Sequence, residues 1–103
     1  MKLEDIAARL EALGNPTRLT IYRLLVRAGP EGLPVGEVQQ RAGAARSTLS
    51  HHLHRLIAVG LVTQERAGTT LICRANYEAM NALVASLTAE CCADSAAPRR
   101  EVA

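Results

Sequence analysis

The segment from Arg46 to Leu56 concentrates hydroxyl, imidazole and guanidinium groups and contains no carboxylate. Its leucines recur with the period of an α-helix, so one face is apolar and the opposite face carries the polar groups. Such a polar face can contact base edges and phosphates in the major groove of DNA. A solvated helix face is the alternative interpretation. The side chains expected to meet DNA are Arg46, Ser47, Thr48, His51, His54 and Arg55.

The three cysteines are the other groups with chemistry of their own. Cys91 and Cys92 are adjacent, whereas Cys73 lies 18 residues before the first of them. This odd number does not resemble a secreted disulfide framework, so a cytoplasmic, reducing location is expected. Two neighbouring thiols at a fraying helix end can turn toward one soft ion, such as trivalent arsenic or antimony. The competing interpretations are a small apolar interface residue for Cys91 and a buried strand residue for Cys73.

The composition predicts a single small domain with an aliphatic core. The chain has 103 residues, of which 49% are hydrophobic, and its only aromatic residues are two tyrosines. Such a composition favours packed helices, and a core of this size is often completed by a partner chain. No apolar run approaches the roughly 20 residues that span a bilayer, and no signal-peptide pattern is present, so no membrane partner is expected.

Positive charge is concentrated in the middle of the chain. Residues 46–74 carry four arginines against Glu65 alone, a local balance of +3, while the rest of the chain has a balance of −1. A basic segment on a nearly neutral scaffold is typical of a protein that binds a polyanion.

The periodicity predicts a mainly α fold with a small β-hairpin, in the order ααααββα. Gly43 lies in the turn between a short helix and the donor-faced helix, an arrangement that defines a helix-turn-helix. The donor-faced helix lacks a capping side chain because Ala45 occupies the N-cap, at a cost of about 1 kcal/mol. Helices are expected over 2–13, 16–28, 35–42, 46–59 and 76–92, with strands over 61–66 and 69–74. Gly14 is expected to stop the first helix as its C′ residue, Asn15 to cap the second, and Gly43 to close the third.

The expected hairpin would form the wing of a winged helix-turn-helix, with Arg66 near its tip and placed for a phosphate or a minor groove. The domain is predicted to cover 1–92, and the Pro-broken segment 93–103 to be a flexible tail. Both terminal helices carry apolar stripes that so small a domain cannot easily bury, which makes them the candidate homodimer interface. On the last helix the stripe consists of Tyr77, Met80, Val84, Leu87 and Cys91.

Three segments together resemble the ArsR/SmtB family of winged helix-turn-helix repressors over roughly residues 3–92. They are Leu13–Leu19, Ser47–Leu53 and Ala58–Val62. The resemblance implies a homodimer on a palindromic DNA operator that dissociates when a metal, metalloid or redox signal binds. It also implies DNA contacts by Ser47, Thr48, His51 and Arg55, with two reading helices one turn of duplex apart.

Two metal sites known in the family have no counterpart here. The Cys-x-Cys pair of the third helix would fall at Pro34 and Gly36. The zinc site of the last helix would fall at about Tyr77, Ala79, Glu90 and Ala93, which cannot supply a tetrahedral set of ligands.

The pair Cys91–Cys92 instead looks like the ending of the arsenic-responsive subgroup, whose members often add a third cysteine in the tail. No cysteine follows Cys92. Either the pair alone binds a methylated arsenical, which needs two thiolates, or a third ligand comes from elsewhere. Cys73 of the partner subunit is one such source.

These observations predict a DNA-binding repressor that needs no cofactor and is released by As(III), Sb(III) or methylarsenite at Cys91 and Cys92. The alternative is a repressor of the same type that responds to redox or persulfide chemistry without a metal. A dimeric protein–protein adaptor without DNA binding is a third possibility, which the donor-rich helix disfavours. No nucleophilic constellation or phosphate-binding glycine loop indicates an enzyme.

Overall fold

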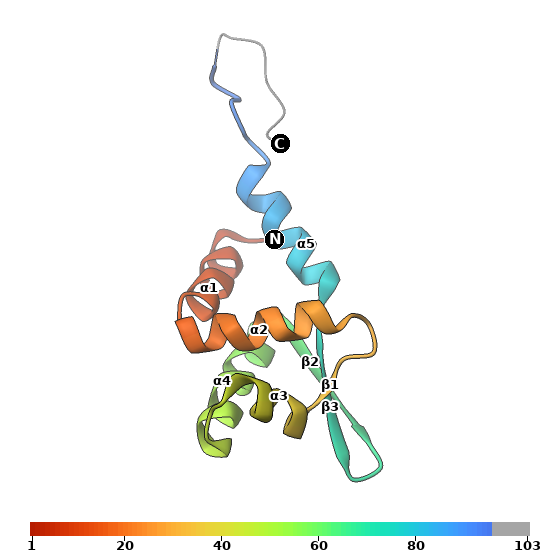
Figure 1. Cartoon of the computed structure of the whole chain (residues 1–103). Coiled ribbons are helices and arrows are strands. Elements are labelled where there is room, and N and C mark those ends of the chain that lie inside the picture. Colours follow the sequence, from red (N-terminus) through yellow and green to blue (C-terminus); the bar gives the residue numbers. More distant parts are fainter. Residues whose placement is uncertain (96–103) are drawn as a thin grey trace.

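The fold, described for residues 1–95 in a computed structural model, is a winged helix-turn-helix with five helices and a small antiparallel sheet (Figure 1). The predicted fold class is confirmed, with one short strand added before the third helix. The elements are α1 (Leu3–Leu13), α2 (Pro16–Ala28), β1 (Leu33–Pro34), α3 (Val35–Ala42), α4 (Arg46–Ala58), β2 (Val62–Ala67), β3 (Thr70–Ala75) and α5 (Tyr77–Thr88).

The sheet has the strand order β1-β3-β2, and both pairings are antiparallel. Strands β2 and β3 form the predicted hairpin, with Val62 opposite Ala75 and Ala67 opposite Thr70. Strand β1 was not predicted from the sequence, because two residues ending in a proline show no alternating pattern. Its position is set by tertiary packing, with Leu33 opposite Cys73.

Local sequence explains most of the helix ends. Asn15 caps α2 by accepting a 3.0 Å hydrogen bond from the backbone N–H of Arg18. Gly43 ends α3 in the left-handed region with φ 67°, as predicted, and Ala45 begins α4 without a side-chain cap. Gly14 was expected to stop α1 as a C′ glycine. It is instead the C-cap residue with φ −75°, so α1 ends without a left-handed residue.

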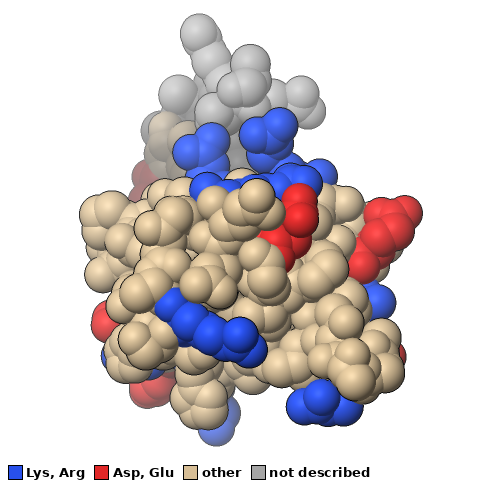
Figure 2. Space-filling model, turned by 60° about the horizontal axis from the view of Figure 1, so that its bottom comes forward, with Lys and Arg blue, Asp and Glu red and all other residues tan. Residues whose placement is uncertain are grey.

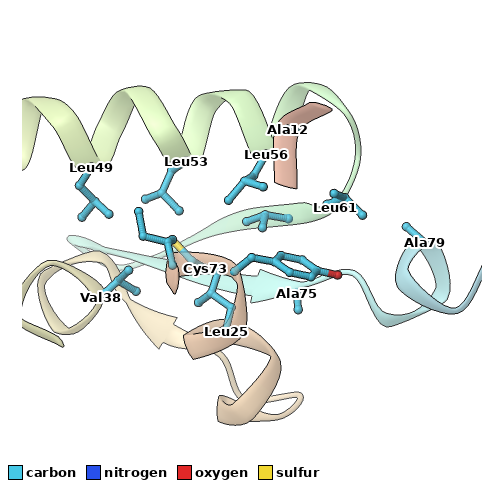
Figure 3. Close-up of a cluster of buried hydrophobic side chains, with 13 residues drawn as sticks. Ala12, Leu25, Val38, Leu49, Leu53, Leu56, Leu61, Cys73, Ala75 and Ala79 are labelled. Carbon is cyan, nitrogen blue, oxygen red and sulfur yellow. The ribbon is translucent and has the colours of Figure 1, made fainter. Parts of the chain in front are cut away.

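The apolar face of α4 lies over the core of the domain. Leu49, Leu53 and Leu56 project from this helix toward the sheet (Figure 3), and each is at most 2% exposed. Below them lie Leu25 of α2 and Cys73 of β3. This packing fixes which side of α4 faces solvent, because the buried leucines cannot leave the core without leaving a cavity.

Helix α5 is fastened to the rest of the domain at its start. Asn76 caps it by accepting from the N–H of Ala79, and its Nδ2 donates to the carbonyl oxygen of Gly60 at 2.9 Å. The Tyr77 hydroxyl donates to Val26 of α2 at 3.0 Å. The helix ends at Thr88, so the predicted extension to Cys92 is wrong.

The chain after Thr88 continues as turns, with Cys92 at φ 62°. The predicted domain boundary at residue 92 stays a prediction, and residues 96–103 of the predicted tail lie outside the described residues.

Helix α2 crosses the middle of the molecule and divides it into two ends (Figure 1). Helices α3 and α4 and the tip of the hairpin lie at one end, and α1 and α5 lie toward the other. Within residues 1–95, no helix has the length and apolarity required to cross a membrane.

Candidate nucleic-acid interface

The outward face of α4 exposes most of the side chains that the sequence predicted for DNA contact. They extend from the first turn of the helix to its third, beside the buried leucines that anchor it. Their presentation on a rigid helix that packs through its other face is the arrangement required of a reading helix in the major groove. The exposed members of the set are Arg46, Ser47, Thr48, His51 and His54.

The wing lies beside the start of α4 and carries the remaining predicted residue. Arg66 is exposed on β2, two residues before the turn that begins at Gly68, and a groove of about 410 Å³ separates it from the starts of α3 and α4. Arg46 and Arg66 both line this groove, together with Gln39 and Thr70. Two guanidinium groups and neutral polar groups around one groove are suited to phosphate oxygens.

The charged groups at this end are separated rather than fused into one stripe. Figure 2 shows several blue patches divided by wide uncharged surface, with acidic groups mainly toward the edges. Hydroxyl and imidazole groups therefore contribute much of the polar surface of α4. This pattern favours contacts to bases at the helix and to phosphates around it.

Arg55 differs from the other predicted residues because its guanidinium already forms an ion pair with a carboxylate of the same chain. Its Nη2 lies 2.6 Å from Oε2 of Glu11 on α1, and its side chain is 42% exposed. The guanidinium is thus directed toward α1, and the neighbouring α4 side chains do not share this contact. Nothing in the sequence near Arg55 signalled this partner, which is 44 residues away.

A polar group that the sequence analysis missed lies behind α4. Arg18 of α2 is 6% exposed, and its Nε donates to the carbonyl oxygen of Ala12 at 2.5 Å. Its Nη1 lies 3.3 Å from Nδ1 of His52. Because a guanidinium can only donate, Nδ1 is the acceptor and the imidazole proton is on Nε2. Arg18 shares a helix face with the buried residues Ile21 and Leu25, and this periodicity could have revealed it.

The environment of His52 favours its neutral form. Burial lowers the pKa of His52 below its ordinary 6.5, and the positive charge of Arg18 and the neighbouring His51 lower it further. A neutral imidazole can accept from Arg18 without charge repulsion. The reading helix is thereby joined to α2 through a hydrogen bond that depends on protonation.

The adjacent thiols lie at the opposite end of the molecule from the tip of the hairpin. The sulfur atoms of Cys91 and Cys92 are 3.5 Å apart and unbonded, with Cys91 half-buried and Cys92 exposed. The left-handed backbone of Cys92 is uncommon for a residue with a Cβ atom. Within residues 1–95, no three or more His, Cys, Asp or Glu side chains gather where they could hold a metal ion, so one chain supplies only this pair.

Cys73 is placed where it cannot easily join that pair. It is fully buried in β3, and burial raises the pKa of its thiol, an effect partly opposed by a 3.4 Å hydrogen bond from Gln64. A neutral thiol in the core is a poor ligand for a soft ion, because the thiolate is the binding form. The predicted alternative in which Cys73 of the partner subunit supplies a third ligand would require this strand to open.

The anchored helix, the turn that precedes it and the adjacent wing define a winged helix-turn-helix DNA-binding protein. A family model described as a helix-turn-helix domain matches residues 13–65, which include α2, α3, α4 and most of β2. The chain belongs to the ArsR family of transcriptional regulators, as its relatives show.

The HTH-type transcriptional regulator YgaV of Escherichia coli strain K12 is 34% identical over 82% of this chain and 83% of its own length. Among solved structures, an ArsR-like regulator from Rhodococcus sp. RHA1 matches with a TM-score of 0.74 and 26% identity, covering 84% of this chain and 78% of that one. Reduced HlyU from Vibrio cholerae N16961 matches with a TM-score of 0.68 and 28% identity, covering 86% and 90%. The first two are described as transcriptional regulators, which agrees with a DNA-binding protein rather than an enzyme.

Proposed function

We propose that this ArsR-family repressor is released from its operator when trivalent arsenic or antimony, or a methylated arsenical, binds Cys91 and Cys92. The observation that carries the proposal is the 3.5 Å separation of the two sulfur atoms in a partly exposed turn. Arsenic(III) and antimony(III) are soft ions that prefer thiolate ligands.

The geometry of the pair suits a single shared ion. Sulfur atoms 3.5 Å apart can both lie about 2.3 Å from one centre, the usual length of a zinc–thiolate bond, at an S–ion–S angle of roughly 100°. That angle is narrower than tetrahedral, and it suits a pyramidal trivalent ion whose lone pair occupies the remaining direction. Two thiolates also satisfy a methylated arsenical, in which carbon occupies the third bond.

The surroundings of Cys91 offer room for an organic substituent. A groove of about 440 Å³ runs between the start of α1 and the end of α5, and Cys91 lines it together with Met1, Ile6 and Leu87. Met1, Ile6 and Leu87 can contact a methyl group on the bound arsenic, while Ser86 and Glu90 line the same groove and can contact a hydroxyl. The groove can therefore accommodate methylarsenite as well as arsenite.

The repressor acts as a homodimer in this proposal, through α1 and α5. Large apolar side chains are exposed on both helices, including Leu3 at 76%, Val84 at 56% and Leu87 at 58%. A second copy would remove these side chains from water and would place two reading helices on one duplex. Inducer binding beside Leu87 would then change the spacing of those helices, provided that it binds one dimer arrangement more tightly.

Release of DNA from the purified, reduced protein tests the proposal. The probe is a fluorescent duplex selected with the wild-type protein from random DNA, titrated with arsenite, methylarsenite, antimonite and zinc. The wild type is expected to release DNA with the arsenic and antimony compounds. The double variant Cys91→Ser, Cys92→Ser is expected to bind the duplex equally well and to retain it. Equal release from this variant, or none from the wild type, contradicts the proposal.

The second candidate is release by oxidation or persulfide formation at the same two thiols. The similarity to HlyU, whose solved structure is described as reduced, favours it, as does the exposure of Cys92. A direct bond would need the sulfur atoms to approach from 3.5 Å to about 2.05 Å, across a strained link between neighbouring residues. Intact-mass measurement after mild oxidant or polysulfide, with operator binding measured in parallel, distinguishes the two candidates.

A further inference from the structure

We infer that Arg55 is a positioning residue, which holds the reading helix against Glu11 of α1, rather than a contact to a DNA phosphate. The sequence places Arg55 among the DNA-contacting side chains, and the resemblance to the family assigns it the same role. The contacts of its guanidinium indicate a different role, which does not depend on the identity of the inducer.

Helix α1 is joined to α4 at two places. The Glu11 carboxylate accepts from Nη2 of Arg55 at 2.6 Å, within the last turns of α4. The Nε of Arg9 donates to the carbonyl oxygen of Val59 at 2.9 Å, just beyond the end of the same helix. Val59 is the C-cap of α4, whose carbonyl has no partner inside the helix, so Arg9 satisfies an otherwise open acceptor.

Glu11 also extends this link toward the core. Its other carboxylate oxygen, Oε1, lies 4.0 Å from Nη2 of the buried Arg18, which in turn contacts His52 on the inner side of α4. The Glu11 carboxylate therefore lies between two guanidinium groups: that of Arg55 on the outer side of α4 and that of Arg18 on its inner side. An attachment of this kind fixes the rotation of α4 about its axis, which decides whether its donors face the groove.

The two roles of Arg55 predict opposite effects for the loss of Glu11. If Arg55 contacted a phosphate, Glu11 would compete with DNA for it, and Glu11→Gln would tighten binding. If Arg55 positions α4, the same substitution loosens the helix and weakens binding, although it also removes a negative charge from the protein. Glu4→Gln is the matched control, because within residues 1–95 the side chain of Glu4, in the first turn of α1, makes no hydrogen bond or ion pair.

Salt dependence separates positioning from phosphate contact. The logarithm of the binding constant falls with the logarithm of salt concentration by about 0.9 for each phosphate contact. Arg55→Gln is expected to lower affinity about two- to fivefold, the scale of an exposed ion pair, with an unchanged slope. Arg46→Gln provides the reference, because loss of a phosphate contact there would make the slope shallower by about 0.9.

The experiment measures binding of the full chain to the selected duplex over a range of salt concentrations, with far-UV circular dichroism to verify folding. Glu11→Gln and Arg9→Gln are each expected to bind more weakly than Glu4→Gln, with the wild-type slope. The double variant Glu11→Gln, Arg55→Gln is expected to bind no more weakly than either single variant, because each substitution breaks the same ion pair between α1 and α4. Tighter or unchanged binding by Glu11→Gln relative to Glu4→Gln, or a shallower slope for Arg55→Gln, overturns the inference.

Discussion

The side chain of Arg18 donates to Nδ1 of His52 across 3.3 Å, which joins the buried side of the reading helix to α2. Because the acceptor is an imidazole, the bond exists only while His52 is neutral. The pKa of His52 is lowered in the folded protein, first by burial and then by Arg18, so the unfolded chain takes up the proton at a higher pH.

Stability is therefore expected to fall as the pH drops through the ordinary histidine pKa of 6.5, because the unfolded state then binds more protons than the folded state. His52→Gln, whose amide oxygen can accept from Arg18 without titrating, should lose less stability over the same interval. Urea unfolding from about pH 7.5 to about pH 5 measures the effect. His54→Gln, at an exposed position of the same helix, controls for the removal of an imidazole. If the free energy of unfolding changed with pH in the same way for the wild type and His52→Gln, this account would be contradicted.

Gly32 is predicted to tolerate substitution less well than Gly43, although both have positive φ, 70° and 67°. A Cβ atom on Gly32 would overlap the carbonyl oxygen of Cys73 and lie 2.6 Å from Cγ of Arg74, whereas one on Gly43 meets nothing within 4 Å. Gly43→Ala should cost about 1–2 kcal/mol from its backbone conformation alone, and Gly32→Ala clearly more. Denaturant midpoints of the two variants test this order, and equal losses would refute it.

Cys73 is predicted to serve packing rather than sensing. Cys73→Ala should reduce the free energy of unfolding by roughly 1–2 kcal/mol, since it removes a fully buried sulfur atom from the core cluster that also contains Val38 and Leu53. In the operator-release assay, the Cys73→Ala variant should release DNA at the same arsenite concentration as the wild type. A variant that folds but no longer responds would assign Cys73 to the inducer site.

Leu87→Glu is expected to convert a dimer to a monomer and to weaken operator binding. Leu87 is 58% exposed on α5, and a charge there would oppose burial against a second copy. Sedimentation velocity measures the change, with Ala85→Glu as a control because Ala85 lies on the other side of the helix. If both variants stay dimeric, the association does not use this face of α5.

Arg66→Gln is expected to lower DNA affinity and to make its salt dependence shallower by about 0.9, as for the loss of one phosphate contact at the wing. Lys2→Gln removes a positive charge at the other end of the molecule and should leave that slope unchanged. Competition binding at several salt concentrations provides the comparison. An unchanged slope for Arg66→Gln would remove the wing from the proposed interface.

Local signals in the sequence predicted the fold where periodicity and turn chemistry agree. The leucines of α4, the Asn15 cap and Gly43 each act within a few residues, so the helix-turn-helix could be located without a structure. Strand β1 and the contact between Glu11 and Arg55 could not, because both depend on segments about 40 residues apart in the chain. The last helix was also predicted to continue to Cys92, whereas it ends at Thr88. No glycine or proline follows Thr88 directly to mark this end in the sequence.

Among the site residues, too, those set by local sequence could be predicted and those set by long-range packing could not. The exposed donors of α4 follow from its leucine stripe, whereas the roles of Arg18 and His52 depend on how α2 and α4 cross. Arg55 could be placed on the polar face from its helical angle alone. Its partner could not be identified, because the approach of α1 to α4 is a property of the folded chain.

The crossing of α2 through the middle of the molecule separates two kinds of change that this protein could undergo during evolution. The sulfur atoms of Cys91 and Cys92 lie in a short turn after α5, and neither residue belongs to the core cluster, so these side chains can be exchanged at little cost to folding. The residues predicted to read DNA lie beyond α2, on a helix whose inner half cannot vary so freely. If the proposed function holds, a lineage can adapt such a protein to a new inducer while its target genes stay the same.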